Sequence, residues 1–380
     1  MPSYLMPKLI FGTGAIEKLP AQAAGFGKRA AVFYAGSFER SGGLEKLTDG
    51  LKALGISSAV KKVSLPDEPS PETVDEAVDF INSSNADMVI SVGGGSVIDT
   101  GKMAAGIAVN GGKAAEYVEN IGTKKFTVLS LPFFAAPTTS GTGSEMAKNG
   151  VVAVKGEYKN SIRSDMLLPK AAVVDPALTL TLPPSVTASS GADALCQLIE
   201  SYTTGPCTPF TDAIALKHIA PMPDALIRAY HDGSDIEARE ALSIGATMSG
   251  ICIANAGLGL AHGISASLGA VCGIKHGIGC GILMPHVARF NASKGVKKYI
   301  DVAKELGREF SDEISAGKYI ADVLRELNQK LGIPEDLKEY ALTEEQKEHV
   351  IRLTAVSSSA RKNPVKASAD EVRELLDALT

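Results

Sequence analysis

Four side chains in the second half of the chain carry oxygen or nitrogen donors of the kind that bind a divalent metal ion. Asp193 and Gln197 stand four residues apart in GADALCQLIE, a spacing that places both on one face of a helix. His262 and His276 follow in GLAHGIS and GIKHGIG. A carboxylate and two imidazoles that converge on one point would bind Fe²⁺ or Zn²⁺. The pattern therefore predicts a metal site to which these four residues belong.

A glycine-rich turn in the first half of the chain suits a phosphate group. A buried strand is expected at 87–92, and it runs into the turn GGGS before a helix expected at 97–109. Gly94 and Gly95 permit close backbone approach, and the helix N-terminus offers free N–H groups and a positive dipole end. Ser96 would either donate to a phosphate or cap the helix. This turn is the first candidate contact for a dinucleotide.

Strands and helices are expected to alternate in the first half of the chain, whereas the second half is expected to be helical. Strands are expected at 29–35, 58–65 and 87–92, with helices at 43–54, 71–82 and 97–109. Beyond TLPPS at 181–185, helices are expected at 186–204, 208–231, 235–256, 259–270, 279–292, 297–306, 314–331, 343–355 and 368–378. We therefore expect an α/β Rossmann-like dinucleotide-binding domain over 1–182, and an all-α domain over 183–380 that binds metal and substrate.

The composition excludes several classes of protein. The chain has 380 residues, 45% of them apolar, and a net charge of −5 without a long Lys/Arg block, so we expect no nucleic-acid partner. No secretion signal and no apolar stretch of about 18 residues is present, which favours a cytoplasmic protein without a membrane partner. The five cysteines form no close metal-type pair and are expected to be reduced thiols. Cys196, beside the metal motif, is interpreted as a small buried hydrophobic residue.

A second polar motif, PTTSGTGSE at 137–145, leads to a family resemblance. Thr138, Thr139 and Thr142 would contact ribose, phosphate or the nicotinamide amide, although an ordinary Ser/Thr-rich turn is the better explanation of this loop taken alone. The motif occurs together with GGGSVID, DP at 175–176, DALxxxIE and LMPHVARFN. With these strings in this order, nearly the whole chain resembles the iron-containing, or group III, alcohol dehydrogenases, from KLIFGTGAIEKLP to KNPVKASADEVRELL.

The resemblance implies roles for the four metal-site residues. The family binds its metal through Asp, His, His and His, and Asp193, His262 and His276 match three of these catalytic ligands, including the fourteen-residue interval between the histidines. Gln197 stands where the family has its second ligand, and an amide oxygen is a weaker ligand than imidazole. Ala266 stands where many members have a histidine that relays a proton. The resemblance thus implies three strong ligands, with Gln197 as a weak ligand or a neighbour of the site.

The resemblance also implies further cofactor contacts. Asp99 lies in GGGSVID, and Lys159 would lie near the ribose or the nicotinamide. In NAD-dependent members an Asp often ends the strand that follows the first βα unit, where it binds the adenosine ribose and repels a 2′-phosphate. Here that strand ends in YAGS, without an acid, so Ser37 and the nearby Arg40 are available to a 2′-phosphate. NADP is therefore favoured over NAD.

The residues and the resemblance together predict an NAD(P)-dependent alcohol dehydrogenase or aldehyde reductase. Hydride would pass between nicotinamide and a small alcohol or aldehyde, with assistance from Fe or Zn, in a homo-oligomer. One alternative is a metal-independent reductase of the same fold, similar to the maleylacetate reductases, that acts on an acidic carbonyl compound. Others are a cyclising lyase related to dehydroquinate synthase and a binding protein without activity.

Overall fold

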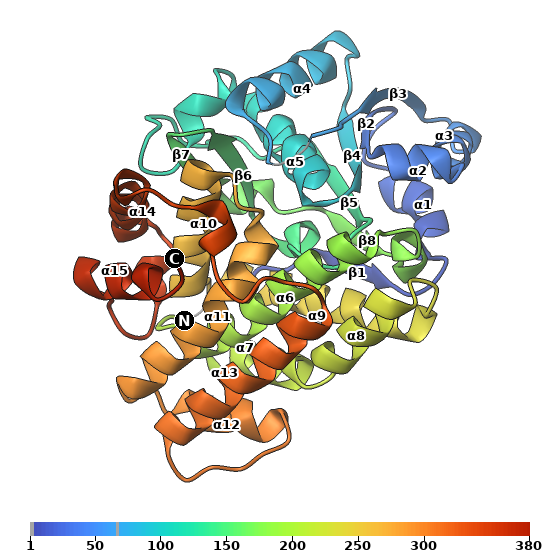
Figure 1. The fold of residues 1–380 in the computed structure, drawn as a ribbon. Coiled ribbons are helices and arrows are strands. Elements are labelled where there is room, and N and C mark those ends of the chain that lie inside the picture. Colours follow the sequence, from blue (N-terminus) through green and yellow to red (C-terminus); the bar gives the residue numbers. More distant parts are fainter. Residues whose placement is uncertain (1–3, 66–67) are drawn as a thin grey trace. The chain divides into compact units, whose positions relative to one another are not determined.

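The structure, a computed structural model, describes residues 4–65 and 68–380 and divides into two compact units (Figure 1). The first, here called the sheet unit, comprises Met1–Thr139, Gly143–Val154 and Asn160–Thr181. The second, the helical unit, comprises Ser140–Thr142, Lys155–Lys159 and Leu182–Thr380. Two short segments from the first half of the sequence thus belong to the helical unit, in addition to the continuous chain that begins at Leu182.

Six parallel strands form the centre of the sheet unit, in the order β1-β8-β5-β4-β2-β3. They are β1 (Lys8–Phe11), β2 (Arg29–Tyr34), β3 (Ser57–Lys62), β4 (Met88–Gly93), β5 (Phe133–Pro137) and β8 (Ala171–Val174). A separate two-stranded sheet consists of β6 (Asn149–Val154) and β7 (Tyr158–Arg163). The α-helices here are α1 (Leu19–Ala23), α2 (Gly36–Arg40), α3 (Gly43–Ala53), α4 (Pro71–Ser83) and α5 (Gly95–Asn110). Short 3-10 helices are η1 (Ala15–Lys18), η2 (Ala114–Tyr117), η3 (Ser144–Met146), η4 (Asp165–Leu167) and η5 (Pro176–Thr179).

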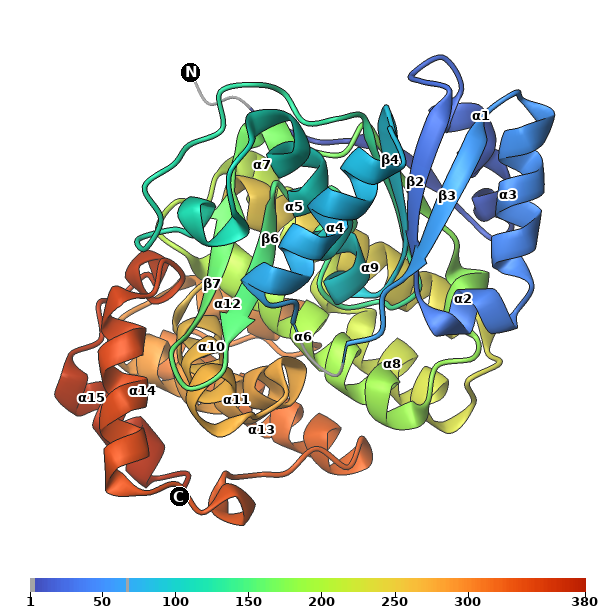
Figure 2. The ribbon, with the colours of Figure 1, turned by 90° about the horizontal axis from the view of Figure 1, so that it is seen from above.

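The four central strands, β2, β4, β5 and β8, are buried on both faces of the sheet. Successive side chains of a strand point to opposite sides, so each face contributes to a core. On one face, Val32 of β2 and Ile90 of β4 share a core with Leu47 of α3. On the other, the ring of Phe33 meets that of Phe80 of α4 edge to face, with centroids 5.7 Å apart. Figure 2 shows α1 and α3 on one side of β2 and β3, and α4 and α5 on the other. This arrangement is the doubly wound α/β architecture that the sequence predicts.

The strand order places a switch point between β2 and β4. The chain leaves β2 for β3 at the edge of the sheet, and then crosses to β4 on the opposite side of β2. In open parallel sheets, the crevice at the carboxyl ends of the two strands at such a point is the usual ligand site. The turns that follow β2 and β4 therefore occupy the expected cofactor position of this unit.

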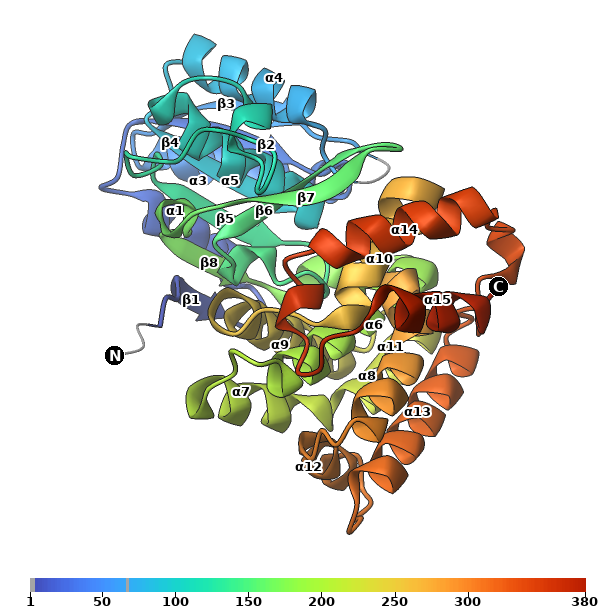
Figure 3. The same cartoon turned by 90° about the vertical axis from the view of Figure 1, so that its left-hand side faces the viewer.

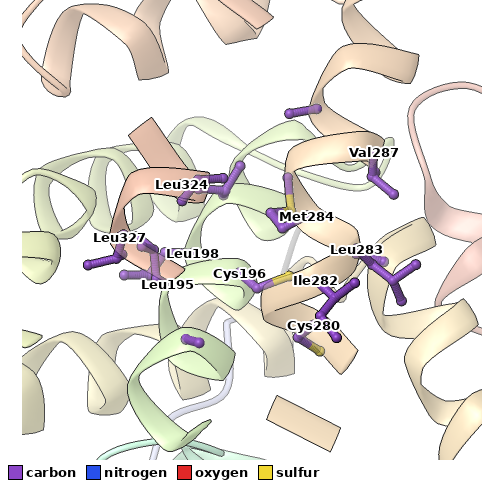
Figure 4. Close-up of a cluster of buried hydrophobic side chains, with 14 of the residues drawn as sticks. Leu195, Cys196, Leu198, Cys280, Ile282, Leu283, Met284, Val287, Leu324 and Leu327 are labelled. Atoms are coloured by element: carbon purple, nitrogen blue, oxygen red, sulfur yellow. The ribbon is translucent and has the colours of Figure 1, made fainter. Parts of the chain in front are cut away.

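The helical unit is built from ten α-helices and two 3-10 helices among the residues that the structure describes. They are α6 (Pro184–Thr203), α7 (Pro209–Ile219), α8 (Met222–His231), α9 (Ile236–Asn255), α10 (Leu260–Cys272), α11 (His276–Ser293), α12 (Lys298–Glu305), α13 (Glu313–Lys330), α14 (Glu344–Val356) and α15 (Ala369–Asp377), with η6 (Lys338–Tyr340) and η7 (Ala360–Lys362). Helix α6 packs against α7, α8, α9 and α11, and α11 also packs against α10 and α13 (Figure 3). In Figure 4, Leu195 of α6, Met284 of α11 and Leu324 of α13 belong to one buried cluster. Helices α6 and α11 thus form the centre of this unit.

The predicted fold class is confirmed, but one predicted helix is wrong. The segment 208–231 is not a single helix, since α7 ends at Ile219 and α8 begins at Met222. Pro221 lies at the break and Pro223 follows in the first turn of α8. A proline lacks the N–H of the helical hydrogen bond and clashes with the preceding turn, so the pattern of apolar residues cannot continue as one helix.

Among the described residues, no single helix is long and apolar enough to cross a membrane. The pair α9 and α10 meets the criteria of length and composition only when the two helices are taken together, and they are bent by 97° relative to each other.

A buried lysine inside the sheet unit generates a prediction about stability. The ammonium of Lys102 in α5 donates to the carbonyls of Ser144 and Asn149 at 2.7 and 2.6 Å, and lies 3.5 Å from the Asp99 carboxylate. Lys102→Met removes the cation from among these acceptors and leaves the buried Asp99 carboxylate without its counter-charge, so the free energy of unfolding should fall by about 3–5 kcal/mol. Equilibrium unfolding in urea, followed by circular dichroism, measures this loss.

The matched control is Lys113→Met. The Lys113 side chain is 67% exposed and pairs with Asp75 at 3.7 Å, so its removal should leave the urea midpoint nearly unchanged. Equal midpoints for the two variants would contradict a structural role for the Lys102 contacts.

Candidate metal and cofactor sites

Three helices of the helical unit bring metal-ligating side chains to one point. His262 Nε2 of α10 lies 3.2 Å from Asp193 Oδ1 of α6, and His276 Nε2 of α11 lies 3.7 Å from the same oxygen. Cys280 Sγ, one turn further along α11, lies 3.8 Å from His276 Nε2. One ligand atom from each of these four residues lies within 4.8 Å of the others. We call Asp193, His262, His276 and Cys280 the metal cluster, because their donors suit a single divalent ion.

The carboxylate of Glu200 orients the first histidine of the cluster. It lies 2.6 Å from His262 Nδ1 and accepts backbone N–H groups of Gly259 at 2.8 Å and of Ala261 at 2.7 Å. A carboxylate has no proton to donate, so Nδ1 carries the ring proton. His262 Nε2 is then available to a metal, in the carboxylate–histidine–metal arrangement common around bound ions.

Glycines allow α11 to bring the second histidine close to the other helices. His276 is the first residue of α11, and its Nδ1 lies 3.2 Å from the hydroxyl of Ser265 in α10. A Cβ on Gly277 would lie 2.0 Å from the carbonyl oxygen of Ser189 in α6, and one on Gly279 would lie 2.5 Å from Ser265 Oγ. Larger residues at either position would push α11 away, and the Nε2 of His276 would no longer face the cluster.

Gln197 lies beside the cluster with both ends of its amide hydrogen-bonded. Its Nε2 donates to Asp193 Oδ2 at 2.8 Å, and its Oε1 accepts from the Ser249 hydroxyl at 2.6 Å. The ionised Asp193 carboxylate only accepts hydrogen bonds, so the Gln197 atom next to it is the amide nitrogen. The amide oxygen, the only metal-ligating atom of Gln197, is therefore turned toward Ser249 of α9.

Buried charge at the cluster favours a cation. Burial opposes protonation of His262, but Cys280, Asp193 and Glu200 together raise the pKa of its imidazole well above the usual value. Burial likewise opposes ionisation of Cys280, yet its hydrogen bond with Cys196 and the neighbouring imidazoles hold the pKa of this thiol well below its usual range. A buried group of anionic donors is stabilised by a positive charge placed among them.

Sequence reasoning overlooked two residues of this site, Glu200 and Cys280. Cys280 follows His276 by four residues, the same spacing that singled out Asp193 and Gln197, so the helical rule was available. Glu200 is the last residue of the DALxxxIE motif, but nothing in the local spacing indicates that it reaches the start of α10. That contact depends on how two helices pack.

In the sheet unit, the two predicted cofactor motifs come together at the carboxyl edge of the sheet. The Thr138 N–H donates to the carbonyl of the last residue of β4 at 3.0 Å. A Cβ on Gly94 would lie 3.4 Å from Thr139 Cγ2, so the two turns are in contact. Gly95 and Ser96 begin α5, with their N-terminal backbone at the same edge. This geometry brings a helix N-terminus and threonine hydroxyls to one place, as a diphosphate requires.

The remaining predicted cofactor residues have different surroundings. Ser37 lies half-buried in α2 directly after β2, on the same carboxyl edge. Asp99 is only 8% exposed, and its carboxylate accepts from the Ser144 hydroxyl and from the Val151 N–H at 2.9 Å. Thr142 and Lys159 belong to the helical unit, where Thr142 is exposed and Lys159 half-buried. Asp99 therefore holds neighbouring segments of the sheet unit together.

A parallel sheet with a glycine turn at its switch point, together with a helical unit that carries a metal cluster, defines a class of two-domain dehydrogenases. Two family models cover the chain: "Iron-containing alcohol dehydrogenase" matches residues 7–176, and "Fe-containing alcohol dehydrogenase family, C-terminal" matches residues 187–380. The chain belongs to the iron-containing alcohol dehydrogenase family.

Individual relatives agree with this assignment. The chain is 31% identical over 377 residues to an NAD-dependent methanol dehydrogenase of Bacillus methanolicus, covering 98% of each. It is 31% identical over 390 residues to an NADPH-dependent butanol dehydrogenase of Clostridium saccharobutylicum, covering 100% of this chain and 98% of the relative. A crystal structure of a 1,3-propanediol oxidoreductase matches all of both chains with a TM-score of 0.93 and 27% identity.

The family assignment confirms the predicted class of activity, an NAD(P)-dependent oxidoreductase that acts on CH–OH groups. It favours metal-assisted interconversion of alcohols and aldehydes over the metal-independent reductase considered above. The relatives include both NAD- and NADPH-dependent enzymes, and the comparisons do not decide between the cofactors.

The position of Glu200 generates a prediction about metal affinity. Glu200→Gln replaces an acceptor by an amide that can donate to His262 Nδ1, which would move the ring proton to Nε2 and block it as a ligand. Metal affinity should fall by about 10–100-fold, as measured by competition with a chromophoric chelator.

Glu237→Gln, an exposed carboxylate at the start of α9, is the control and should leave the affinity unchanged. An unaltered affinity in Glu200→Gln would show that His262 does not depend on this partner.

Proposed function

We propose that this chain transfers hydride between the nicotinamide of NADP(H) and a small alcohol or aldehyde, at a divalent metal site held by Asp193, His262 and His276. The convergence of both Nε2 atoms on Asp193 Oδ1, at 3.2 and 3.7 Å, is the observation that carries the proposal. A bound divalent metal supplies Lewis-acid stabilisation of negative charge on the substrate oxygen. The cofactor supplies the hydride acceptor or donor.

The residues of the chain provide orientation and exclude water. Asp193 and His262 side chains are 5% and 3% exposed, whereas that of His276 is 22% exposed. Substrate therefore approaches the cluster from the side of His276. Glu200 and Ser265 hold the two rings in place, so little reorganisation accompanies the reaction.

The cofactor diphosphate is assigned to the carboxyl edge of the sheet unit. Gly94, Gly95 and Ser96 offer backbone N–H groups at the start of α5, and Thr138 and Thr139 adjoin them. Thr142 and Lys159 remain candidates for the nicotinamide end of the cofactor. A homo-oligomeric, cytoplasmic enzyme remains the expectation from composition and family resemblance.

The preference for NADP is supported by basic side chains at the end of β2. A Cβ on Gly36 would lie 3.2 Å from an Arg40 guanidinium nitrogen and 3.3 Å from Lys62 Nζ. The nearest acid, Glu39, pairs with Lys62 at 2.8 Å and accepts from the Tyr34 hydroxyl at 3.3 Å. Two cations next to Gly36 would attract a 2′-phosphate at the position where an acid would repel it.

The test of the catalytic proposal is His262→Ala. Loss of the ring removes a metal ligand, so kcat should fall by about 10³-fold or more, which corresponds to the several kcal/mol of charge stabilisation that a metal provides. Affinity for NADPH, measured by the fluorescence of the bound cofactor, should change little because His262 is not among the proposed cofactor contacts and the diphosphate is assigned to the sheet unit.

His231→Ala is the control, since His231 is exposed at the end of α8. Both variants are assayed by NADPH oxidation with a series of small aldehydes. Equal losses of turnover and cofactor affinity in His262→Ala would refute the assigned role.

The test of cofactor choice is the double variant Arg40→Ala/Lys62→Ala. Its kcat/KM for NADPH should fall roughly tenfold or more relative to that for NADH, because each charge-assisted hydrogen bond contributes about 1.5–3 kcal/mol. Lys52→Ala, an exposed cation in α3, should leave the ratio unchanged. A wild-type enzyme that prefers NADH, or an unchanged ratio in the double variant, would refute the preference for NADP.

A further inference from the structure

We propose that Cys280 is the fourth protein ligand of the metal, so that the site consists of Asp193, His262, His276 and a thiolate, and selects zinc over iron. This inference rests on the proposed function, which requires a metal at the same point, but it goes beyond it by assigning the ligand and the metal.

The first support is distance. In a tetrahedral zinc site with bonds of about 2.0–2.3 Å, neighbouring ligand atoms lie roughly 3.3–3.8 Å apart. The distances from Asp193 Oδ1 to His262 Nε2 and His276 Nε2 are 3.2 and 3.7 Å, and Cys280 Sγ lies 3.8 Å from His276 Nε2. All four donors lie within 4.8 Å of one another. The cluster therefore needs only small adjustments to surround one ion.

The second support is helical geometry. Cys280 follows His276 by one turn of α11, just as Gln197 follows Asp193 by one turn of α6, and the two helices pack against each other. Each helix thus offers a pair of residues to the same space. Figure 4 shows Cys280 of α11 and Cys196 of α6 in the same buried region. The fourth donor can come from either helix.

Gln197 is the weaker of the two candidates. To coordinate a metal, its Oε1 would have to leave the Ser249 hydroxyl at 2.6 Å, and its Nε2 would have to leave Asp193 Oδ2 at 2.8 Å. In its present orientation, Gln197 stabilises Asp193 by donating to the oxygen that does not face the histidines. Orientation of a ligating carboxylate by a neighbouring donor is common around metal ions.

Cys196 does not belong to this group of donors. Its Sγ lies 3.7 Å from His262 Nδ1, the nitrogen that faces Glu200, whereas the metal cluster surrounds Nε2. The Glu200 carboxylate beside it is occupied by backbone N–H groups of Gly259 and Ala261. Cys196 is as deeply buried as Cys280, at 2% against 0% exposure, which makes it a matched control for substitution.

A thiolate changes the preference of the site. Soft sulfur ligands favour Zn²⁺, whereas oxygen and nitrogen donors alone distinguish less between Fe²⁺ and Zn²⁺. Catalytic zinc sites sometimes expand to five ligands in the transition state, and such an expansion would admit the substrate oxygen beside four protein donors. A mixed Asp–His–His–Cys site is thus compatible with both zinc selectivity and turnover.

The decisive experiment is cobalt substitution, followed by absorption spectroscopy. The metal is removed with a chelator and replaced by Co²⁺, whose visible bands report binding and whose near-ultraviolet thiolate-to-cobalt band reports a sulfur ligand. The wild type should show both. Cys280→Ser should keep the visible bands but lose the thiolate band, while Cys196→Ser should keep both.

The outcomes separate this inference from the proposed function. Visible bands without a thiolate band in the wild type, or a thiolate band that persists in Cys280→Ser, would overturn the role of Cys280 and leave the metal site standing. Absence of any bound Co²⁺ in the wild type would overturn both.

Metal selection gives an independent readout. Elemental analysis of protein purified without chelators, from cells supplied with iron and zinc, should find zinc in the wild type. Zinc affinity, measured by competition with a chromophoric chelator, should fall in Cys280→Ser by at least about 10–100-fold. Losses of this size already follow when a residue that only hydrogen-bonds to a metal ligand is replaced, and Cys280 would be a ligand itself. Iron in the wild type, or an unchanged zinc affinity in the variant, would refute zinc selection by a thiolate.

Discussion

The buried carboxylate of Glu200 links the folding of the helical unit to its chemistry. Helix α10 begins after Gly259, which has no side chain to cap the free backbone N–H groups, and Glu200 of α6 accepts three of them, from Gly259, Ala261 and His262. The same carboxylate accepts from His262 Nδ1. Asp193 lies two helical turns before Glu200 on α6, so one contact fixes both the position of α10 and the meeting of Asp193 with His262. The metal cluster thus depends on the hydrogen bonds that Glu200 accepts from the backbone N–H groups at the start of α10.

Residue spacing predicted the structure correctly where all the residues concerned lie in one helix or in one continuous strand–turn–helix segment. The four-residue rule placed Asp193 and Gln197 on one helical face, and the strand–glycine–helix pattern located the turn after β4. Short strands were harder to detect: β5 and β8 have only five and four residues, with alanine at several positions, and contain no alternating polar pattern because both faces of the sheet are buried. The break between α7 and α8 was missed although Pro221 indicated it.

Contacts between different helices could not be predicted from residue spacing. Glu200 meets α10, and Ser249 meets Gln197, through sequence separations of about fifty residues or more that no local pattern encodes. The glycines of α11 had a visible signal, GIGCG, but its meaning depends on the close approach of α6 and α10 to that face. Residue types therefore indicated the chemistry of the site, while packing determined which donors take part. Gln197 is the clearest example: it stands where the family has a metal ligand, but only the structure shows that its amide oxygen points toward Ser249.

A Cys280 thiolate would also contribute negative charge to a buried metal site. Asp193, His262 and Cys280 are almost completely buried, and a dication among them must be neutralised by nearby anions since water cannot do so. As direct ligands, Asp193 and neutral Gln197 would supply one negative charge, beside the Glu200 carboxylate behind His262. Asp193 and a Cys280 thiolate would supply two negative charges directly at the dication, and the imidazoles can then bind in their neutral form. In this arrangement the Gln197 amide has a different task, namely to donate to Asp193 while Ser249 holds its oxygen, so that the carboxylate is correctly oriented.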